Sequence, residues 1–414
     1  MATVTINGLK ATVPDDTTIM QAAKSIGIHI PGLCNLEGVH SFGACRICVV
    51  EVEGARTLQA SCLAKVRDGM VIHTNTGKVR QARRVLYELL LSDHDKECFI
   101  CTRSRDCELK ALGETLGVSE TRFEGEHISP PSDVSVAITR DMGKCVLCRR
   151  CVTICNNIQK TGVLNAQNRG FDTVIAPAME SPLGSASCVF CGQCTVVCPT
   201  GALHETDSTQ KVWNMLDGKK RTVVQVAPAI RVAIGEEFGL EPGSRVTGKL
   251  AAALRLMGFD DVFDTNFAAD LTIMEEGTEF LSRVKAALTG GEATLPMITS
   301  CSPGWIKYIA HHHPGKLANL STCKSPHMML GAVAKSYYAE KIGVKPEDIN
   351  VVSVMPCTAK KFEINRHEMF NNGVPNVDAV LTTRELARMI REAGIDFCAL
   401  PDAEFDSPLG MSTG

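Results

Sequence analysis

The sequence predicts a multidomain α/β protein in which cysteine-rich segments precede a larger layered domain. The chain has 414 residues and is 44% hydrophobic, so it is long enough to form several cores. Fifteen of its nineteen cysteines lie before residue 199, in tight clusters. After residue 220 the chain alternates buried-strand and helix patterns, which is typical of a layered α/β domain.

The composition excludes several classes of function. A net charge of −3 and a pI near 6.4 provide no general attraction for nucleic acid or anionic membranes. The sequence has no apolar run long enough to span a bilayer and no N-terminal export signal, so we expect a soluble cytoplasmic protein. An odd number of cysteines in such a protein favours metal ligands over a disulfide framework.

The first domain is predicted over residues 1–78. Asn7-Gly8 between two alternating runs is a strong hairpin signal, and residues 16–18 are expected to cap a helix that reaches about Ile26. The expected strands are at residues 3–6, 9–13, 48–53 and 70–74.

Four cysteines of this domain follow the order C-x10-C-x2-C-x13-C: Cys34, Cys45, Cys48 and Cys62. The tight central pair supplies two thiolates from one loop, and the small residues Gly38, Gly43 and Ala44 let backbone amides approach sulfides. This pattern suits a [2Fe–2S] cluster. A structural zinc site with four cysteine ligands is the alternative.

A small helical domain is predicted over residues 79–118, with helical periodicity at 79–91. It contains one histidine and three cysteines at H-x3-C-x2-C-x5-C spacing: His94, Cys98, Cys101 and Cys107. Spacing alone fits either a zinc ribbon or a [4Fe–4S] cluster with one histidine ligand, and the neighbouring cysteine motifs favour the cluster. Residues 119–140 are polar and contain Pro-Pro, so we expect a connector there.

The most specific pattern is C-x2-C-x2-C-x3-C, which occurs twice in a domain predicted over residues 135–210. The spacing is typical of bacterial ferredoxins, in which three cysteines bind one [4Fe–4S] cubane and the fourth binds the other. Two zinc knuckles are a weaker alternative, because zinc sites seldom use this spacing twice. The expected crossed ligand sets are Cys145, Cys148, Cys151 with Cys198, and Cys188, Cys191, Cys194 with Cys155.

The last predicted domain covers residues 220–414. Its patterns indicate strands at 223–229, 260–265 and 351–355 and a helix at 245–257. Two motifs each end a strand with a cysteine and begin a helix: T-S-C-S-P-G-W around Cys301 and M-P-C-T-A-K-K-F-E around Cys357. In an α/β domain such turns at strand ends carry ligands.

These two motifs and the order of the preceding modules resemble multi-cluster [FeFe]-hydrogenases over the whole chain. The first two modules also resemble the large iron–sulfur subunits of respiratory complex I and of NAD-linked formate dehydrogenases. The resemblance implies a β-grasp ferredoxin-like N-terminal domain, one [2Fe–2S] cluster and three accessory [4Fe–4S] clusters. It further implies an H-cluster, in which a cubane is bridged to a di-iron unit, and reversible H2 oxidation.

The resemblance also implies partners. Ferredoxin or a flavin- and NAD(P)-binding subunit would exchange electrons with the chain, which shows no Gly-rich nucleotide fingerprint of its own. Maturation proteins would assemble the catalytic centre.

Roles for individual residues follow from the same resemblance. Cys357 would be a cubane ligand, Lys360 would hold a cyanide ligand, and Met355 would pack against the di-iron unit. The pocket would be lined by Ala227, Pro228 and Ala229. The proton path would use Glu276, Glu279, Ser321 and Cys301, with the Cys301 thiol as the last donor to the bridging amine.

Two departures from the family pattern affect the catalytic centre. Many relatives have two cysteines where this chain has Cys301-Ser302, so Cys301 is expected to be either the proton donor or a cubane ligand. The third family signature, a Gly-rich stretch with two cysteines, is missing before the chain stops at 409–414. We therefore expect a C-terminally incomplete catalytic domain. The alternative is a non-catalytic electron-transfer subunit of an NAD(P)-linked redox complex.

Other side chains have simpler interpretations. Cys323 and Cys398 are expected to be buried small hydrophobic residues. The run 311–313 of three histidines is interpreted as a solvated helix end rather than a metal site, and Trp305 as a packing residue.

Overall fold

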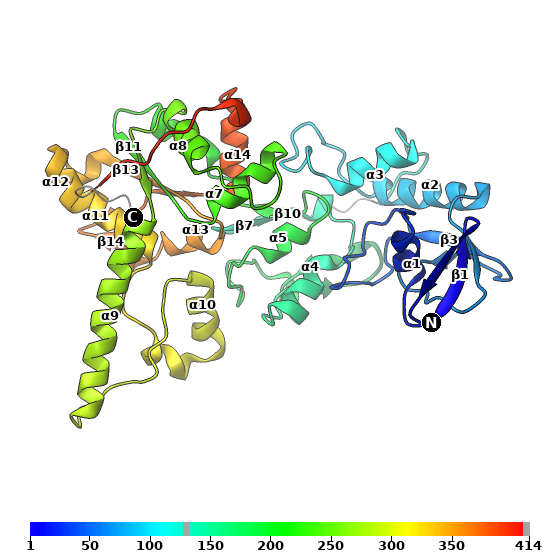
Figure 1. Cartoon of the computed structure of the whole chain (residues 1–414), viewed down its shortest axis with the longest axis horizontal. Coiled ribbons are helices and arrows are strands. Elements are labelled where there is room, and N and C mark those ends of the chain that lie inside the picture. The colour runs from blue at the N-terminus through cyan, green and yellow to red at the C-terminus, as the bar shows by residue number, and fades with distance from the viewer. Residues whose placement is uncertain (127–131, 409–414) are drawn as a thin grey trace. The chain divides into compact units, whose positions relative to one another are not determined.

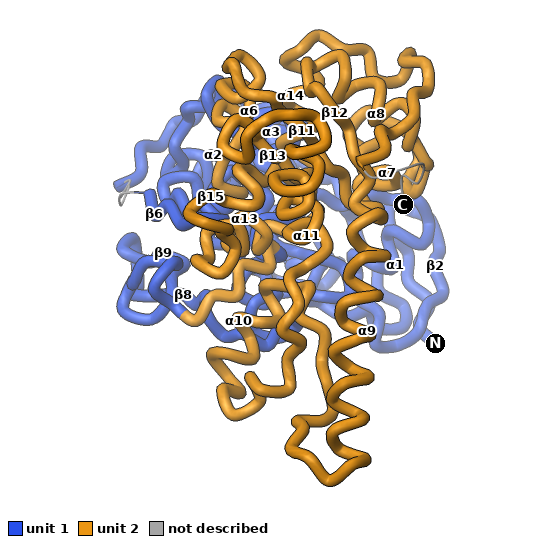
Figure 2. The backbone as a smooth tube through the Cα atoms, turned by 90° about the vertical axis from the view of Figure 1, so that its left-hand side faces the viewer, with its two compact units in different colours: residues 1–186, 193–204 blue, residues 187–192, 205–414 orange. Residues whose placement is uncertain are grey.

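This computed structural model describes residues 1–126 and 132–408, which Figure 1 shows as ribbons. The chain divides into two units, coloured separately in Figure 2. Unit 1 comprises residues 1–186 and 193–204, and unit 2 comprises residues 187–192 and the chain from 205 onward. Among the residues described, none of the helices combines the length and apolar character needed to cross a membrane.

Unit 1 begins with a five-stranded sheet in the order β2-β1-β5-β3-β4. β1 pairs antiparallel with β2 and parallel with β5. The predicted hairpin is confirmed, because Asn7 and Gly8 have φ of 47° and 86°, as a two-residue turn between twisted strands requires. The strands are β1 (Ala2–Ile6), β2 (Leu9–Val13), β3 (Val49–Val52), β4 (Gln59–Ala60) and β5 (Val71–His73).

The first helix, α1 (Ile19–Ser25), begins where a capping box forms. Thr18 accepts a hydrogen bond from the Gln21 amide, and the Gln21 side chain accepts one from the Thr18 amide. Thr18 is the last residue of the predicted capping run 16–18, so this prediction is confirmed and narrowed to one residue. The buried face of α1 packs against the sheet and closes the core of this domain.

The remainder of unit 1 consists of short elements between cysteine-bearing loops. Its helices are α2 (Gly77–Ser92), α3 (Glu108–Leu116), α4 (Arg150–Thr153) and α5 (Gln193–Val197). Its other strands are β6 (Asp133–Val134), β7 (Ile138–Arg140), β8 (Asn165–Gln167), β9 (Val174–Ala176) and β10 (Leu203–Glu205), whose last residue belongs to unit 2.

The predicted connector at 119–140 is only partly correct. Residues 127–131 lie outside the described residues, and the end of the segment forms the antiparallel pair β6–β7. Ser135 stabilises the turn between these strands, because its hydroxyl accepts from the Ile138 amide at 3.0 Å. Local side-chain bonding therefore produced strands in a segment whose composition is that of a loop.

Unit 2 is built on a parallel sheet in the order β12-β11-β13-β16. The three predicted strands are confirmed as β11 (Arg221–Val226), β12 (Asp261–Asp264) and β13 (Ile349–Val354), and β16 (Ala379–Leu381) is the fourth. α8 (Thr247–Leu256), which the sequence predicted, packs against β12. Figure 1 also shows that α9 (Asn266–Leu288) extends well beyond this sheet.

Other helices of unit 2 cover the sheet or connect its strands. α6 (Thr209–Leu216), α13 (Ala359–Glu363) and α14 (Thr383–Glu392) pack against β16. The remaining elements are α7 (Ile230–Ala233), α10 (Pro303–His312), α11 (Pro326–Val333), α12 (Ala339–Ile342), β14 (Phe370–Asn371) and β15 (Val374–Pro375).

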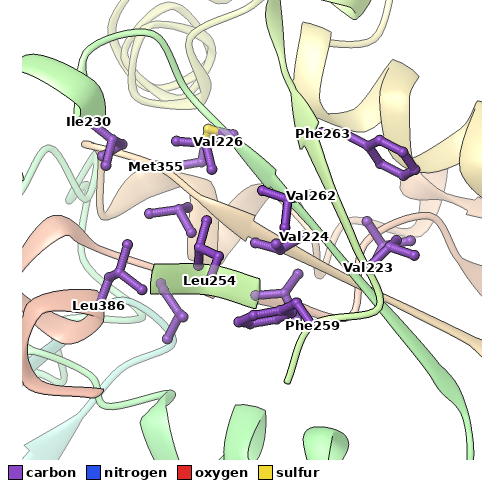
Figure 3. Close-up of a cluster of buried hydrophobic side chains, with 14 of the residues drawn as sticks. Val223, Val224, Val226, Ile230, Leu254, Phe259, Val262, Phe263, Met355 and Leu386 are labelled. Atoms are coloured by element: carbon purple, nitrogen blue, oxygen red, sulfur yellow. The ribbon is translucent and has the colours of Figure 1, made fainter. Parts of the chain in front are cut away.

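The core of unit 2 explains why the sequences of its strands are nearly continuous runs of apolar residues. A parallel sheet is covered on both faces, so successive side chains are buried whichever way they point. Val223 and Val224 of β11 are both fully buried, and Val262 of β12 and Leu254 of α8 join the same cluster (Figure 3).

A buried ion pair stabilises the edge of this core at β16. The Lys361 ammonium donates to Glu385 Oε1 at 2.8 Å, to the Val380 carbonyl at 2.8 Å and to Ser208 Oγ at 2.6 Å. The other oxygen of Glu385 accepts from the Thr382 amide at the start of α14. Each charge is therefore paired and hydrogen-bonded, as burial requires.

We expect Lys361→Met to destabilise unit 2 by about 3–5 kcal/mol, because it leaves the Glu385 carboxylate buried without its cation. The two tryptophans of the chain, Trp213 and Trp305, both belong to unit 2, so denaturant unfolding followed by tryptophan fluorescence reports on this unit.

The matched control is Glu347→Gln, which removes an exposed carboxylate and should change the free energy of unfolding by less than about 0.5 kcal/mol. If both variants unfold at the same denaturant concentration, the ion pair does not stabilise this edge.

Candidate functional site

The first cysteine set converges in unit 1, between α1 and β5. Cys34, Cys45, Cys48 and Cys62 are all buried. Hydrogen bonds from the Cys45 and Cys62 thiols hold the pKa of Cys34 well below its usual range, and a hydrogen bond from Cys62 lowers the pKa of Cys48 to about 6. The four predicted ligands of this site are therefore linked by hydrogen bonds between their thiols, the side-chain type that soft metals prefer.

A backbone amide next to this set of cysteines is directed at a cysteine sulfur. The Leu33 amide donates to Cys45 Sγ at 3.4 Å. Gly43 has φ of 70° and lies against Leu63, where an added Cβ would meet Leu63 at 2.4 Å. Gly43 therefore fits against Leu63, the neighbour of Cys62, where a larger residue would clash.

The second set lies around a cavity of about 620 Å³ in unit 1, which His94, Cys98 and Cys107 line together with Tyr87 and Lys110. Burial raises the pKa of Cys107. The fourth predicted ligand, Cys101, lies against Gly201, where an added Cβ would be 2.7 Å from its sulfur. The structure thus brings three of these four side chains around one cavity.

The third set matches one of the two crossed groupings predicted for the doubled motif. Cys145, Cys148, Cys151 and Cys198 line one small cavity of unit 1, although Cys198 is 47 residues away from Cys151. Burial raises the pKa of Cys145 and of Cys148 to about 12. A bound cation would reverse this effect, because metal coordination favours the thiolate.

The two copies of the doubled motif share one local geometry. Leu147 donates to Cys145 Sγ at 3.4 Å, and Phe190 donates to Cys188 Sγ at 3.4 Å. Leu147 and Phe190 occupy the same position of the repeat and have φ of 50° and 55°. Arg149 and Gly192, two residues later, are also left-handed. The repeated sequence therefore produces a repeated loop that directs amides at sulfur.

The other ligands of the doubled motif are distributed over both units. Cys155 is buried in unit 1 and accepts from the Leu164 amide at 3.4 Å. Cys194 lies in α5 of unit 1, whereas Cys188 and Cys191 belong to unit 2. The second crossed grouping stays a prediction.

In unit 2, the carboxyl ends of β11 and β13 bring two predicted pocket segments together. The strands pair in parallel with Val226 opposite Val354, and the Ala227 amide donates to the Val354 carbonyl at 3.0 Å. Ala227, Pro228 and Ala229 therefore begin at the same edge as Met355 and Cys357. Met355 is buried in the core with Val226 and Ile230 (Figure 3), and its predicted contact with a di-iron unit stays a prediction.

Lys360 connects the two cysteine motifs of this unit. Its ammonium donates to the Cys301 carbonyl at 2.8 Å and to Glu363 Oε2 at 2.8 Å. Two of its three N–H donors are thus used by the protein. Cys301 itself is exposed, and Cys357 is half-buried in the turn before α13.

A buried histidine completes the environment of Lys360. His327 Nε2 lies 2.7 Å from Glu363 Oε2, and His327 Nδ1 lies 3.2 Å from Ser353 Oγ. Burial lowers the pKa of His327. Burial opposes ionisation of Glu363, but the charges and hydrogen bonds of His327 and Lys360 outweigh it and lower the pKa of Glu363 to about 2. Glu363 is therefore an anion that holds the Lys360 cation in place.

Two residues predicted for a proton path, Glu279 and Ser321, are in contact. Ser321 Oγ donates to Glu279 Oε2 at 2.9 Å, and Arg283 Nη2 donates to Glu279 Oε1 at 2.6 Å. Burial raises the pKa of Glu279, but these two partners outweigh it and lower the pKa overall. The strand-like segment at 298–300 runs beside Leu320, which places the Cys301 motif next to Ser321.

Some interpretations of side chains need correction. Cys323 is half-buried and its Sγ lies 3.8 Å from Glu279 Oε2, so it belongs to this polar group rather than to the core. Cys398 is exposed, because Phe397 takes the buried position of that turn. The three histidines lie exposed at the end of α10, as predicted, and Trp305 is partly exposed and stacks on Tyr308.

The sequence predicted no role for Arg283 or His327, and Glu363 was noted only as the last residue of the M-P-C-T-A-K-K-F-E motif. The only local signal was the i, i+4 spacing of Glu279 and Arg283, which is common on solvated helix faces. In the described ranges, no group of three or more His, Cys, Asp or Glu side chains has the arrangement for a single metal ion.

A loop of unit 2 joins the doubled motif to the Cys357 turn. Thr358 Oγ1 donates to the Phe190 carbonyl at 2.6 Å, and an added Cβ on Gly192 would meet Thr358 Oγ1 at 2.5 Å. The Lys307 ammonium lies 5.1 Å from the Phe190 ring and 4.4 Å from the Phe362 ring. Residues between Cys188 and Cys191 therefore contact residues beside Cys357 directly.

Four family models match the chain in succession. Residues 1–77 match a 2Fe-2S iron-sulfur cluster binding domain, and residues 83–122 match the NADH-ubiquinone oxidoreductase-G iron-sulfur binding region. Residues 135–202 match a 4Fe-4S dicluster domain, and residues 220–414 match the C-terminal domain of the iron only hydrogenase large subunit.

Named relatives agree with these matches. The NADP-reducing hydrogenase subunit HndD of Solidesulfovibrio fructosivorans is 51% identical over all of this chain and 72% of its own length. Iron hydrogenase 1 of Clostridium pasteurianum is 38% identical over the same shares. A solved structure of the apo [FeFe]-hydrogenase HydA1 from Chlamydomonas reinhardtii is 44% identical, with a TM-score of 0.48. That match covers 50% of this chain, which spans 53% of the HydA1 chain.

The sulfur-directed amides, the converging thiols and the matched iron–sulfur domains fit iron–sulfur cofactors. The chain belongs to the [FeFe]-hydrogenase family, the iron-only hydrogenases.

Proposed function

We propose that this chain is the catalytic chain of an [FeFe]-hydrogenase, which interconverts H2 with two protons and two electrons. The observation that carries the proposal is the meeting of three groups in unit 2. Cys357 follows β13, and Lys360 holds the Cys301 peptide. Ser321, which bonds Glu279 of α9, lies on the segment that pairs with residue 298 of the Cys301 motif. A soft ligand, a fixed cation and a proton-carrying pair are the parts that such a reaction needs.

The residues of this site would bind the catalytic cluster and enclose it. Cys357, and Cys301 if it is a ligand, would bind the catalytic cubane, and a bound di-iron unit would supply the metal at which H2 is formed or split. The remaining N–H of Lys360 is available for an anionic ligand such as cyanide, because Glu363 and the Cys301 carbonyl fix its position. Ala227, Pro228, Ala229 and Met355 would form the apolar wall that excludes water.

Protons would travel by a relay of side chains. The Ser321 hydroxyl can pass a proton from the solvent side to Glu279 or receive one, because it both donates and accepts. Glu276 lies one helical turn from Glu279 on α9 and would be the neighbouring carrier. Cys301 would be the last donor, and Cys323 offers a second thiol within reach of Glu279.

Electrons would travel through unit 1. We propose one [2Fe–2S] cluster in a domain at residues 1–78, one [4Fe–4S] cluster at residues 79–118 and two at residues 135–210, before a catalytic domain from residue 220. The contact between Thr358 and Phe190 would be the exit from the doubled motif toward Cys357. This layout accounts for fifteen cysteines and His94 as ligands.

The electron partner in this proposal is nucleotide-linked. The relative HndD is described as a subunit of an NADP-reducing hydrogenase. A separate flavin- and NAD(P)-binding subunit would then exchange electrons with the chain, and ferredoxin is the other candidate. Maturation proteins would insert the di-iron unit.

A second function is favoured by one residue. Ser302 stands where a cubane ligand is expected, and oxygen is a poorer ligand than sulfur for iron–sulfur clusters. In that case the chain would carry electrons without activating H2.

The first prediction separates these two functions. The full-length protein, produced with the maturation proteins, should show infrared bands of bound carbon monoxide and cyanide and should evolve H2 from reduced viologen. Clusters detected by iron and sulfide analysis without infrared bands or H2 would leave only the electron-transfer function.

The second prediction concerns the proton relay. Glu279→Gln should lower H2 turnover by about 100-fold or more while the clusters stay intact, because general acid–base groups contribute about 10²–10⁴-fold. Glu275→Gln is the matched control, since Glu275 lies exposed on the same helix. Equal turnover in the two variants would exclude Glu279 from the relay.

The third prediction concerns Glu363. Its pKa in the folded protein is about 2 against an ordinary value of 4.5, so ionised Glu363 stabilises the fold above pH 4.5 and this contribution is lost as the pH falls toward 2. Glu363→Gln should therefore lower the free energy of unfolding by roughly 3 kcal/mol at pH 7. The difference from the parent protein should shrink between pH 4.5 and pH 2 in acid-series denaturation curves. A constant difference across this range would contradict the assignment.

A further inference from the structure

One buried guanidinium in unit 1 touches the ligand loops of three predicted clusters. Arg150 precedes Cys151 at the start of α4 and is 5% exposed. Its side chain reaches two other loops that lie 115 and 42 residues away in the sequence. No other function has been assigned to it above.

The contacts of Arg150 are made next to cluster ligands. Nη1 and Nη2 donate to Glu108 Oε1 and Oε2 at 2.7 and 2.9 Å, which is the paired geometry of a strong guanidinium–carboxylate bond. Nη2 also donates to the Asn35 carbonyl at 3.2 Å. Glu108 follows Cys107 and Asn35 follows Cys34, so each partner is adjacent to a ligand of a different site.

The Arg150 guanidinium lies in a buried region close to the cysteines of two predicted clusters. Cys34 and Cys45 of the first site share one buried cluster with Cys148 of the doubled motif. Cys148 and Cys34 both lie near enough to act electrostatically on the guanidinium. In such an interior a charge acts more strongly than in water, because the local dielectric constant is low.

A second link joins the same two loops. His40, from the loop between Cys34 and Cys45, lies with Nε2 3.2 Å from the Cys148 carbonyl and with Nδ1 2.6 Å from Thr153 Oγ1. The loop of the first site is thus held on the Cys148 loop at two points.

One donor of Arg150 has no protein acceptor. Its Nε–H is buried and makes no hydrogen bond to any described residue. A buried N–H without a partner costs about 1–3 kcal/mol, so an acceptor is expected. Cluster sulfides and cysteine sulfurs accept such bonds, and hydrogen bonds to sulfur raise the reduction potential of a cluster.

We propose that Arg150 is a positioning residue of the electron relay, whose guanidinium holds three ligand loops together and raises the reduction potentials of the [2Fe–2S] cluster and of the Cys145–Cys198 cubane. Glu108, whose side chain is 46% exposed, offsets this charge from the outer side. The step that Arg150 influences is the passage of one electron between these clusters, in which one is oxidised and the other reduced and no bond or proton changes. The inference rests on the proposed relay but not on H2 chemistry.

The test is a redox titration of the full chain, loaded with iron and sulfide and followed by electron paramagnetic resonance. Arg150→Gln should make both clusters harder to reduce, by about tenfold in the ratio of reduced to oxidised cluster at a fixed potential, or about 59 mV for a one-electron couple. Glu108→Gln should shift the same midpoints in the opposite direction, because it removes a negative charge.

The matched control is Arg149→Gln. Arg149 carries the same charge one residue earlier, but it is partly exposed and its guanidinium lies over the Phe42 ring at 4.6 Å. This variant should leave both midpoints unchanged. Opposite shifts in the two test variants, with an unchanged control, would support the proposal, since a purely structural ion pair predicts no such opposition.

The proposal is overturned if Arg150→Gln shifts the midpoints no more than Arg149→Gln does. If Arg150→Gln loses its clusters, Glu108→Gln decides, and unchanged midpoints in that variant overturn the proposal. Failure of the proposed function is recognised separately, because it is read from the infrared bands and H2 evolution of the matured protein, which this titration does not use.

Discussion

Directing backbone amides at cysteine sulfur is the constraint on which unit 1 depends. A cluster ligand in a low-dielectric interior needs hydrogen-bond donors around it, and a regular helix or strand uses its amides within itself. The chain meets this need with the left-handed residue Leu147, whose amide donates to Cys145, and with the amides of Leu33 and Leu164, which donate to Cys45 and Cys155. The short helices α4 and α5 beside such loops are consistent with this need.

In unit 2, regular strands bring the segments of the candidate site together. Its parallel strands end at one edge of the sheet. The segments that follow Val226 and Val354 therefore start side by side, and no local sequence motif is needed to bring them together. The polar groups placed there are buried and paired: Glu363 is an anion because Lys360 is beside it, and Lys360 is fixed because Glu363 and the Cys301 carbonyl hold it. Rigid strands and a satisfied ion pair together give the edge a defined geometry, which a reactive site requires.

Much of this could be predicted from sequence, and the failures have physical causes. The hairpin at Asn7-Gly8 and the strands of unit 2 were predictable because turn chemistry and apolar runs are local signals. The capping run 16–18 of α1 was also predictable, but only the structure shows that Thr18 is the residue that bonds Gln21. Cys398 was expected to be buried, but its neighbour Phe397 filled the core instead.

The sequence by itself determined the ligand chemistry and the family. Spacings such as C-x2-C-x2-C-x3-C act within one loop, so the number and kind of ligands can be read without knowing the fold. Only the tertiary structure decided which loops share a partner. Arg150 meets Glu108 and Asn35, and His327 meets Glu363, across separations of 36 to 115 residues. Such pairs depend on how the chain folds back on itself, because side chains distant in sequence interact only after the core has brought their loops together.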